Sequence, residues 1–266
     1  MPADRTDRLG KALGSGADVV IVDLEDAVLP SARKQARDAI HSVWPGVAEA
    51  DKPRLMLRIN AVGTPDHEPD VELARELAEQ EFGGVMLAKA ESSNDLRALD
   101  ARLKHGALVP LVESGAGLDA LHSMAEVPRV VRFALGHLDL QSDLGVACGP
   151  EEEEIAPARW ELIRATRRAL LAPPIDGVTT DFKDLSKVRS DCQRSLRMGF
   201  GAKLCIHPVQ VAAVHEAFAP TMEQVQHARR VLEAAKEAGS GACVLDGRMV
   251  DAPVLALARR TLERAR

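Results

Sequence analysis

Acidic and basic side chains follow several short apolar runs of this chain. Glu25 and Asp26 come directly after VVIVDL, and Glu113 ends LVPLVE. Carboxylate oxygens are the hard ligands that Mg²⁺ prefers, and the ion usually takes only one or two of them from a protein. Arg58 lies in a third run, LMLRIN, and its permanently charged fork suits a developing oxyanion better than lysine would. The pattern predicts a site for a metal ion and an anionic substrate.

Each of these residues also has a structural explanation that the sequence alone leaves open. Glu113 precedes a Gly-Ala-Gly turn and is placed to cap a helix there, and Glu25 and Asp26 are placed to cap the segment that follows them. Arg58 is expected to form a buried ion pair with one of these two acids if it does not contact substrate.

The apolar runs indicate a parallel sheet. Segments rich in Val, Ile and Leu alternate with longer segments whose apolar residues recur every three or four positions, as expected of βα units. Several runs are almost continuously apolar, which is typical of strands that are buried on both faces. Seven strands are predicted, over residues 17–24, 54–60, 84–89, 108–113, 130–136, 176–180 and 202–207.

Helical periodicity fills most of the remaining chain. Ser92 or Ser93 is expected to cap the second of these helices. The acidic run at residues 151–154 is expected to form the solvated first turn of the third, where negative charge is favourable. The predicted helices cover residues 31–44, 93–104, 151–171, 187–198, 209–218, 221–238 and 252–265.

Seven strands followed by helices are one strand short of a closed barrel. In a (β/α)8 barrel the reacting groups lie at the C-terminal ends of the strands, where the polar residues occur here. We therefore expect an α/β fold, a (β/α)8 TIM barrel whose first strand is missing or truncated at the N-terminus. The catalytic barrel is expected over residues 1–238 and a C-terminal helical lid over 239–266, with Gly239-Ser240-Gly241 as a hinge.

The composition excludes several classes of protein. The 266 residues, 46% of them hydrophobic, are enough for one globular domain with a substantial core. A net charge of -6 and only 3% aromatic residues argue against nucleic acid as the main partner. No apolar run approaches the roughly 18 residues needed to span a bilayer, and the N-terminus lacks the apolar stretch of a signal peptide. We expect a cytoplasmic protein that binds no membrane.

Five sequence strings together resemble the HpcH/HpaI aldolase and citrate lyase β-subunit superfamily, in its CoA-ester lyase branch. The strings occur in the order found in the family, and the resemblance runs from about Arg8 to Arg264. One string alone is weak, but five in order are a specific signal. Ala202 departs from the family, which usually has Gly there. The strings are GADVVIVDLEDAV, LRIN, VESGAGL, GHLDLQSDLG and GFGAKLCIHPVQV.

The resemblance implies a ligand set for a divalent metal ion, expected to be Mg²⁺. Glu113 and Asp139 match the metal ligands of the family. Asp143 competes with Asp139 in the same loop, but the family places its ligand three residues after the glycine of GHLD, and we expect a structural role for Asp143. Glu25 and Asp26 resemble an acidic pair that orients the waters around the metal.

Four further residues match positions that contact the substrate or transfer protons in the family. Arg58 matches the arginine that holds the substrate carbonyl or enolate oxygen. Lys89 and His207 are expected to contact substrate or CoA, although Lys89 is equally suited to pair with Glu91. Asp251 matches an aspartate of the lid that reaches the site of a neighbouring subunit and transfers a proton. It is also well placed to cap the last helix.

The implied reaction is the cleavage or formation of a carbon-carbon bond in a 3-hydroxyacyl-CoA that also carries a carboxylate. Citryl-CoA, malyl-CoA and citramalyl-CoA are candidates, and each would give acetyl-CoA and a 2-oxoacid. The motifs are common to all three substrates, so the sequence fixes the reaction type better than the substrate. The resemblance also implies a homo-oligomer, commonly a trimer.

Two other functions stay open. A pyruvate-type class II aldolase acting on free substrates would use the barrel and the metal without CoA, but the C-terminal segment GRMVDAPV favours the CoA branch. A catalytically silent CoA-binding subunit would agree with a missing first strand, because barrel closure positions the loops of the site. The presence of Glu113, Asp139 and Arg58 together argues against it.

Overall fold

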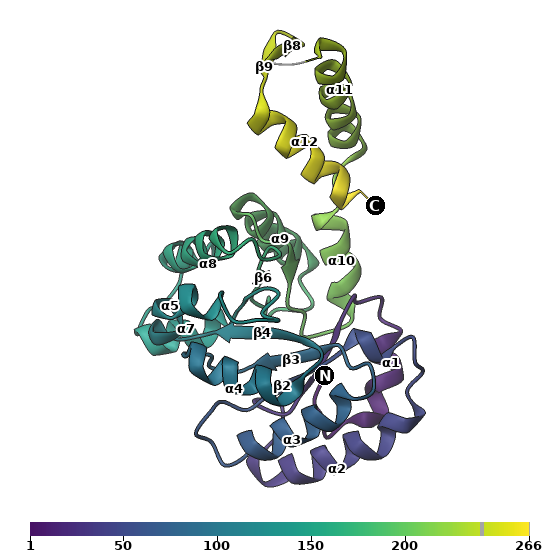
Figure 1. Ribbon diagram of the computed structural model, residues 1–266, viewed down its shortest axis with the longest axis vertical. Coiled ribbons are helices and arrows are strands. Elements are labelled where there is room, and N and C mark those ends of the chain that lie inside the picture. The colour runs from purple at the N-terminus through teal and green to yellow at the C-terminus, as the bar shows by residue number, and fades with distance from the viewer. Residues whose placement is uncertain (240–241, 266) are drawn as a thin grey trace. The chain divides into compact units, whose positions relative to one another are not determined.

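The computed structural model describes residues 1–239 and 242–265. The chain divides into two compact units, Met1–Ala212 and Ala213–Arg266 (Figure 1). This division falls within a helix, α10 (Val209–Phe218), and lies before the boundary at 238–239 that the sequence suggested. Two of the three residues of the expected hinge, Ser240 and Gly241, lie outside the described residues.

A parallel sheet of seven strands forms the centre of the first unit. Each strand is hydrogen-bonded to the next one along the chain, so the spatial order is β1 to β7. All seven predicted strands are confirmed; six of them are shorter than predicted, and β4 has the predicted length but begins one residue earlier. The strands are β1 (Val20–Asp23), β2 (Leu55–Ile59), β3 (Gly84–Leu87), β4 (Ala107–Val112), β5 (Ala134–Leu135), β6 (Ile175–Asp176) and β7 (Ala202–Lys203).

The first three residues run beside β1. The Met1 ammonium donates to the Ile21 carbonyl at 2.6 Å, Ala3 N–H donates to the Asp23 carbonyl, and Asp23 N–H donates to the Met1 carbonyl. Pro2 thereby forms a parallel bridge with Asp23. Among the described residues no strand pairing links this segment to β7, so closure into a (β/α)8 barrel remains a prediction.

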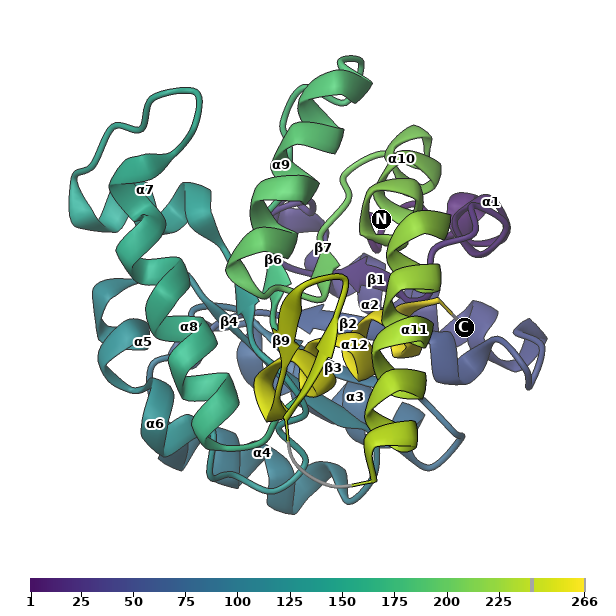
Figure 2. The same ribbon diagram turned by 90° about the horizontal axis from the view of Figure 1, so that it is seen from above.

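Helices follow the strands as predicted for βα units. α3 and α4 pack against β2, β3 and β4 (Figures 1 and 2), and the Ser92 hydroxyl caps α4 by accepting from Asn94 N–H. The α-helices that lie wholly in this unit are α1 (Leu9–Leu13), α2 (Arg33–Val43), α3 (His67–Ala78), α4 (Ser93–Leu103), α5 (Gly115–Asp119), α6 (Leu121–Met124), α7 (His137–Leu144), α8 (Ala156–Arg168) and α9 (Leu185–Met198).

Apolar side chains cover both faces of the sheet, as the continuous apolar runs predicted. Successive residues of a strand point to opposite faces. One set from β2, β3 and β4 therefore packs under the surrounding helices, and the alternate set forms a smaller inner cluster. The inner cluster contains Met56, Met86, Val109, Leu111 and Ala134.

The acidic run at residues 151–154 forms the expected solvated helical turn only in part, since Glu153 and Glu154 are exposed in a turn that leads into α8, whereas Glu152 is not. α8 begins only at Ala156, after a 3-10 helix at Glu153–Ile155. Glu152 has a left-handed backbone, with φ 52°, and its carboxylate contacts the guanidinium groups of Arg159 and Arg194. The prediction was wrong for Glu152, because two largely buried arginines require a carboxylate at this point.

The second unit consists of two helices and a hairpin. α11 (Met222–Ala238) begins with a capping box in which Thr221 and Gln224 bond reciprocally. β8 (Cys243–Leu245) and β9 (Arg248–Val250) pair in antiparallel fashion, and α12 (Ala252–Arg264) follows. Both helices match the prediction, whereas the hairpin was not predicted. No helix in the described part of the chain has the length and apolar character needed to cross a membrane.

Candidate active site

Six of the predicted site residues gather at the carboxyl ends of β1 to β5. They form two groups of opposite charges that share the same edge of the sheet. Arg58 on β2 faces the acidic residues that follow β1, and Lys89 after β3 faces those that follow β4 and β5. Parallel strands explain this arrangement, because their carboxyl ends all lie at one edge.

Asp23 orients the guanidinium of Arg58. Its two carboxylate oxygens accept from Nε at 2.7 Å and from Nη2 at 2.5 Å, and the two residues are direct partners in the register of β1 and β2. This bidentate pairing fixes the plane of the guanidinium. The sequence analysis missed Asp23, although a carboxylate inside the apolar run VVIVDL was a signal that it needs a buried cation.

The remaining guanidinium nitrogen of Arg58 faces the acidic pair. Nη1 lies 3.0 Å from Glu25 Oε2 and 3.4 Å from Asp26 Oδ2, so the ion pairing that the sequence left open is present. Burial opposes the charge of Arg58, but the hydrogen bonds that it donates to Asp23 and the charges of the nearby carboxylates outweigh this effect and raise its pKa. Arg58 is a permanently charged, oriented cation at the edge of the sheet.

Glu25 is a buried carboxylate with an unsatisfied oxygen. Desolvation raises its pKa to about 7, against the attraction of Arg58 and with repulsion from Asp26 and Asp23. Its Oε2 atom makes no hydrogen bond within the described part of the chain, although it is close to Arg58 Nη1. A buried oxygen of this kind is suited to accept from an ordered water or to approach a cation.

Glu113 lies deeper in the same edge of the sheet. Its side chain is only 3% exposed, and Oε1 accepts from Lys89 N–H at 2.7 Å. Desolvation raises its pKa to about 7, Lys89 opposes this, and Glu25 and Asp139 add to it. Glu113 does not cap a helix, since the Ser114 hydroxyl caps α5 instead.

Asp139 lies in the first turn of α7 and is partly exposed. Its Oδ2 accepts from Lys89 Nζ at 3.0 Å, and the same Nζ is 4.0 Å from Glu113 Oε1. Lys89 therefore bridges the two predicted metal ligands and does not pair with Glu91, which accepts from the Ser114 hydroxyl.

Asp143, the competing carboxylate, has a different place in the structure. Its Oδ2 accepts from Gly115 N–H at 2.8 Å, at the start of α5. This contact links α7 to α5 and agrees with the structural role expected for Asp143.

The carboxylates of Glu113 and Asp139 fit a hard divalent cation. Both already contact one cationic group, Lys89 Nζ, so the two side chains point to a common position. Within the described residues no group of three acidic, histidine or cysteine side chains is arranged to hold a metal. Two carboxylates are nevertheless a usual protein contribution to Mg²⁺, which keeps water or substrate oxygens in its other positions.

His207 is not part of either group of charges. It is exposed, its Nδ1 accepts from Val209 N–H at 3.2 Å, and its ring stacks on Phe182 with the centroids 4.6 Å apart. Its contact with substrate or CoA stays a prediction.

Asp251 belongs to the second compact unit. Its side chain accepts from Val254 N–H and caps α12, which confirms the structural alternative. A role in proton transfer stays a prediction.

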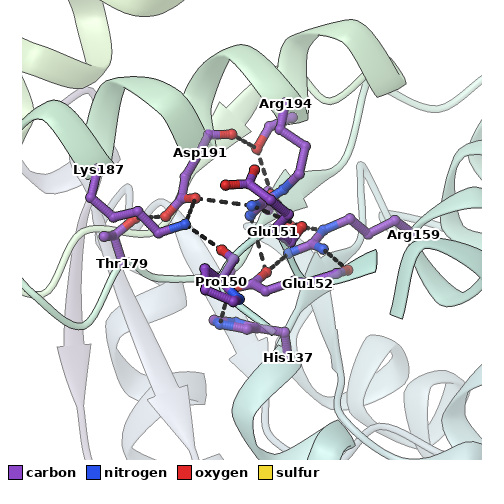
Figure 3. A network of polar contacts seen from close by, with 12 residues as sticks. His137, Pro150, Glu151, Glu152, Arg159, Thr179, Lys187, Asp191 and Arg194 are labelled. Atoms are coloured by element: carbon purple, nitrogen blue, oxygen red, sulfur yellow. Dashed lines mark hydrogen bonds and ion pairs between the residues drawn. The ribbon is translucent and has the colours of Figure 1, made fainter. Parts of the chain in front are cut away.

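A buried polar network that the sequence analysis missed lies beneath the start of α7 (Figure 3). His137 is two residues before Asp139, and its Nε2 is 3.5 Å from Glu152 Oε1. Burial lowers the pKa of His137, while Glu152 opposes this effect. Arg159 joins Glu152 to Asp176 on β6. The network fixes the loop and strand against which the helix carrying Asp139 begins.

The model of the HpcH/HpaI aldolase/citrate lyase family matches residues 1–208. This chain belongs to that family. The matched segment contains both groups of charges described above. Membership confirms the resemblance found in the sequence strings.

Relatives from several bacteria span nearly the whole chain. A citrate lyase subunit beta-like protein of Deinococcus radiodurans is 35% identical and covers 98% of this chain and 94% of its own. An L-malyl-CoA/beta-methylmalyl-CoA lyase of Cereibacter sphaeroides is 33% identical, with 94% and 88% covered. A (3S)-malyl-CoA thioesterase of the same species is 30% identical, with 100% and 92% covered.

A solved structure of the family is similar over the whole chain. The protein CitE of Mycobacterium tuberculosis, in complex with magnesium, acetoacetate and coenzyme A, has a TM-score of 0.86 and 32% identity, and the match covers 100% of this chain and 96% of CitE. The likeness supports a TIM-barrel-like α/β fold for this chain. Family members thus include a lyase and a thioesterase of CoA esters, and one member binds magnesium and CoA.

Proposed function

We propose that this protein is a Mg²⁺-dependent carbon-carbon lyase that cleaves or forms a 3-hydroxyacyl-CoA carrying a carboxylate. Citryl-CoA, malyl-CoA and citramalyl-CoA are its candidate substrates, and acetyl-CoA and a 2-oxoacid its products. The observation that carries the proposal is the convergence of Glu113 and Asp139 on one cation position, beside the oriented guanidinium of Arg58.

Glu113 and Asp139 would hold the metal. When bound, the ion would lower the pKa of the substrate hydroxyl and polarise the carbonyl that forms from it. Glu113 is held for this task by Lys89 N–H, and its burial makes an unneutralised carboxylate costly. Glu25, with its unsatisfied Oε2, would orient a water at the edge of the site, together with the more exposed Asp26.

Arg58 would stabilise the enolate of the departing acetyl-CoA. Asp23 holds Nε and Nη2, so Nη1 is the nitrogen left for a substrate oxygen. That nitrogen lies 3.0 Å from Glu25 Oε2 and 3.4 Å from Asp26 Oδ2. The Asp26 side chain is 60% exposed and can leave at little cost, so a substrate oxygen would take its place while Glu25 stays. A preorganised charge aimed at a developing oxyanion is among the strongest contributions to catalysis.

The carbon atom of the enolate needs a proton donor. We assign this role to Asp251 of a neighbouring subunit or to a water, with residues 239–266 acting as a lid in a homotrimer. Asp251 caps α12 by accepting a long hydrogen bond from Val254 N–H, at 3.3 Å. Breaking this bond would free the carboxylate for proton transfer.

The decisive test is a product assay with acetyl-CoA and oxaloacetate, glyoxylate or pyruvate in turn, each with and without Mg²⁺. We expect metal-dependent condensation with one oxoacid. Asp139→Asn and Arg58→Lys are each expected to lower kcat by at least roughly 100-fold, the scale of removing one preorganised charge. Asp143→Asn, four residues from Asp139 on the same helix, is the matched control and is expected to retain activity.

Metal-independent turnover, or equal activities of Asp139→Asn and Asp143→Asn, would contradict the proposal. Condensation of free pyruvate with an aldehyde in the absence of CoA would instead identify a class II aldolase. Binding of CoA and Mg²⁺ without turnover of any oxoacid would identify a catalytically silent subunit.

A thioesterase is the second candidate, because a (3S)-malyl-CoA thioesterase is similar over the full chain. The two activities differ in which bond of the substrate breaks. With malyl-CoA as the probe, a lyase gives acetyl-CoA and glyoxylate, whereas a thioesterase gives malate and free CoA. Chromatography of the products separates the two outcomes.

A further inference from the structure

Lys89 has a strained backbone conformation that positions both its amide and its ammonium. It is a non-glycine residue with φ 46°, in the left-handed region that L-residues rarely adopt. Such a conformation persists when the surrounding structure compensates for it. Here Lys89 N–H donates to the buried Glu113 Oε1 at 2.7 Å, and the side chain extends to Asp139.

The ammonium of Lys89 lies between the two predicted metal ligands. Nζ is 3.0 Å from Asp139 Oδ2 and 4.0 Å from Glu113 Oε1. Partial burial disfavours its charge, but the bond to Asp139 and the charges of Glu113, Asp139 and Glu25 raise its pKa. These two carboxylates thus have a positive charge beside them.

Lys89 is the more easily displaced of the two cations in the site. Its side chain is 45% exposed and ends in a single ammonium on a flexible stem. The side chain of Arg58 is 18% exposed and is fixed by two hydrogen bonds that it donates to Asp23. Lys89 can therefore leave the carboxylates for solvent, whereas Arg58 stays in place.

We propose that the Lys89 ammonium neutralises Glu113 and Asp139 in the metal-free protein and is displaced when a divalent cation binds, so that the cation competes with this side chain. The inference rests on the metal site of the proposed function. Its consequence is that Lys89 weakens metal binding while it stabilises the empty site, and that the released ammonium becomes available to an anionic group of the substrate.

The test is a calorimetric titration with Mg²⁺ alone, in the absence of substrate. Lys89→Met is expected to bind Mg²⁺ more tightly than the unchanged protein, by roughly threefold to tenfold, the scale of one partly exposed ion pair. Without metal, the same variant is expected to have a lower melting temperature than the unchanged protein. Added Mg²⁺ is expected to raise its melting temperature by more. Lys89→Arg keeps the charge and is expected to bind Mg²⁺ like the unchanged protein.

A matched control removes one lysine charge elsewhere. Lys34 pairs with Asp38 on the surface of α2, and Lys34→Met is expected to leave Mg²⁺ affinity unchanged. Unchanged or weaker Mg²⁺ binding by Lys89→Met, with a folded protein by circular dichroism, would overturn the inference.

Two further variants separate this failure from a failure of the metal site itself. Glu113→Gln and Asp139→Asn are expected to lose Mg²⁺ binding. If they do and Lys89→Met has the affinity of the unchanged protein, only the competition by Lys89 is wrong. If they bind Mg²⁺ as well as the unchanged protein does, the proposed metal site is wrong, and the inference is overturned with it.

Discussion

The two halves of the sheet are held together by different forces. β1 to β4 have four to six residues each, and their side chains belong to a large apolar cluster. β5, β6 and β7 have only two residues each. Beside β6, the side chains of Asp176, Arg159 and Ser195 are almost completely buried and are joined by hydrogen bonds.

The difference shows that short strands can be placed by buried polar groups where backbone pairing is sparse. A buried ion pair does not by itself add much stability, but it strongly disfavours any arrangement in which one partner is left alone. The site spans both halves: Arg58 lies on β2 and Glu25, Lys89 and Glu113 follow other strands of the apolar half, whereas Asp139 follows β5. The position of Asp139 therefore depends on the buried polar groups beside β5 to β7, whereas the strands that carry the other site residues pack in the apolar cluster.

The largest effect is expected from Asp176→Ala. Asp176 has no exposed surface, and Arg159, its partner at 3.0 Å, is 1% exposed. Removal of the carboxylate leaves the buried guanidinium of Arg159 without one of its two acidic partners. We therefore expect a loss of about 3–5 kcal/mol in the free energy of unfolding. Urea denaturation followed by circular dichroism measures this loss.

An apolar replacement of the pair is the control. Asp176→Leu combined with Arg159→Met removes both charges, and it is expected to recover most of the stability lost in Asp176→Ala. A loss below about 1 kcal/mol for Asp176→Ala would mean that this half does not depend on its buried charges.

The next effect is a pH dependence that originates mainly in the apolar half. Burial raises the pKa of Glu113 from its ordinary value of 4.5 to about 7. Between these values the folded protein binds a proton that the unfolded chain has lost, so stability falls as pH rises. In the metal-free protein, Glu113 alone is expected to account for about 3 kcal/mol of this fall in the free energy of unfolding. We expect Glu113→Gln to flatten the fall, as measured by urea denaturation between pH 4.5 and 8.

The exposed Glu126 is the control for this prediction. Glu126→Gln should leave the pH profile unchanged, because its side chain is in water in both states. An equally steep profile for Glu113→Gln would show that burial of Glu113 is not its origin. Added Mg²⁺ should also flatten the profile, because it favours the ionised carboxylate.

The smallest effects are expected from two helix caps, one in each half. Ser92 caps α4 and Asp184 caps α9 through backbone N–H groups. Ser92→Ala and Asp184→Ala are each expected to cost about 1 kcal/mol in unfolding free energy. Equal costs would show that local helix caps do not distinguish the halves. A much larger cost for Asp184→Ala would show that the second half depends on polar groups at its helix ends as well as on its buried ion pairs.

The sequence predicted the strands well because their apolar runs are nearly continuous. It placed all seven in order, and it overestimated the lengths of the last three. Residues 130–136 illustrate the reason: only Ala134 and Leu135 pair as a strand, while Val130 makes an isolated bridge. A pattern of side chains reports burial, but backbone pairing also depends on the neighbouring strand.

The site was predictable to the extent that its residues follow strands. Arg58, Glu113 and Asp139 were found in this way, and the structure gives each one an oppositely charged neighbour. The partners were harder to predict. Lys89 pairs across the sheet edge with Asp139 and not with the nearby Glu91, because the backbone turns at Lys89. Glu152 was assigned to solvent, since sequence cannot show that Arg194, 42 residues further along the chain, approaches it together with Arg159.

Two glycines limit the amino-acid substitutions that this site can accept. A methyl group on Gly136 would lie 2.5 Å from Glu113 Oε2, and one on Gly177 would lie 2.1 Å from His137 Nδ1. Both neighbouring side chains are buried, so an added methyl group would force them to move. Directed evolution toward another acyl-CoA should therefore accept substitutions at exposed positions such as Leu138, which is 48% exposed, and reject nearly every residue at these two glycines.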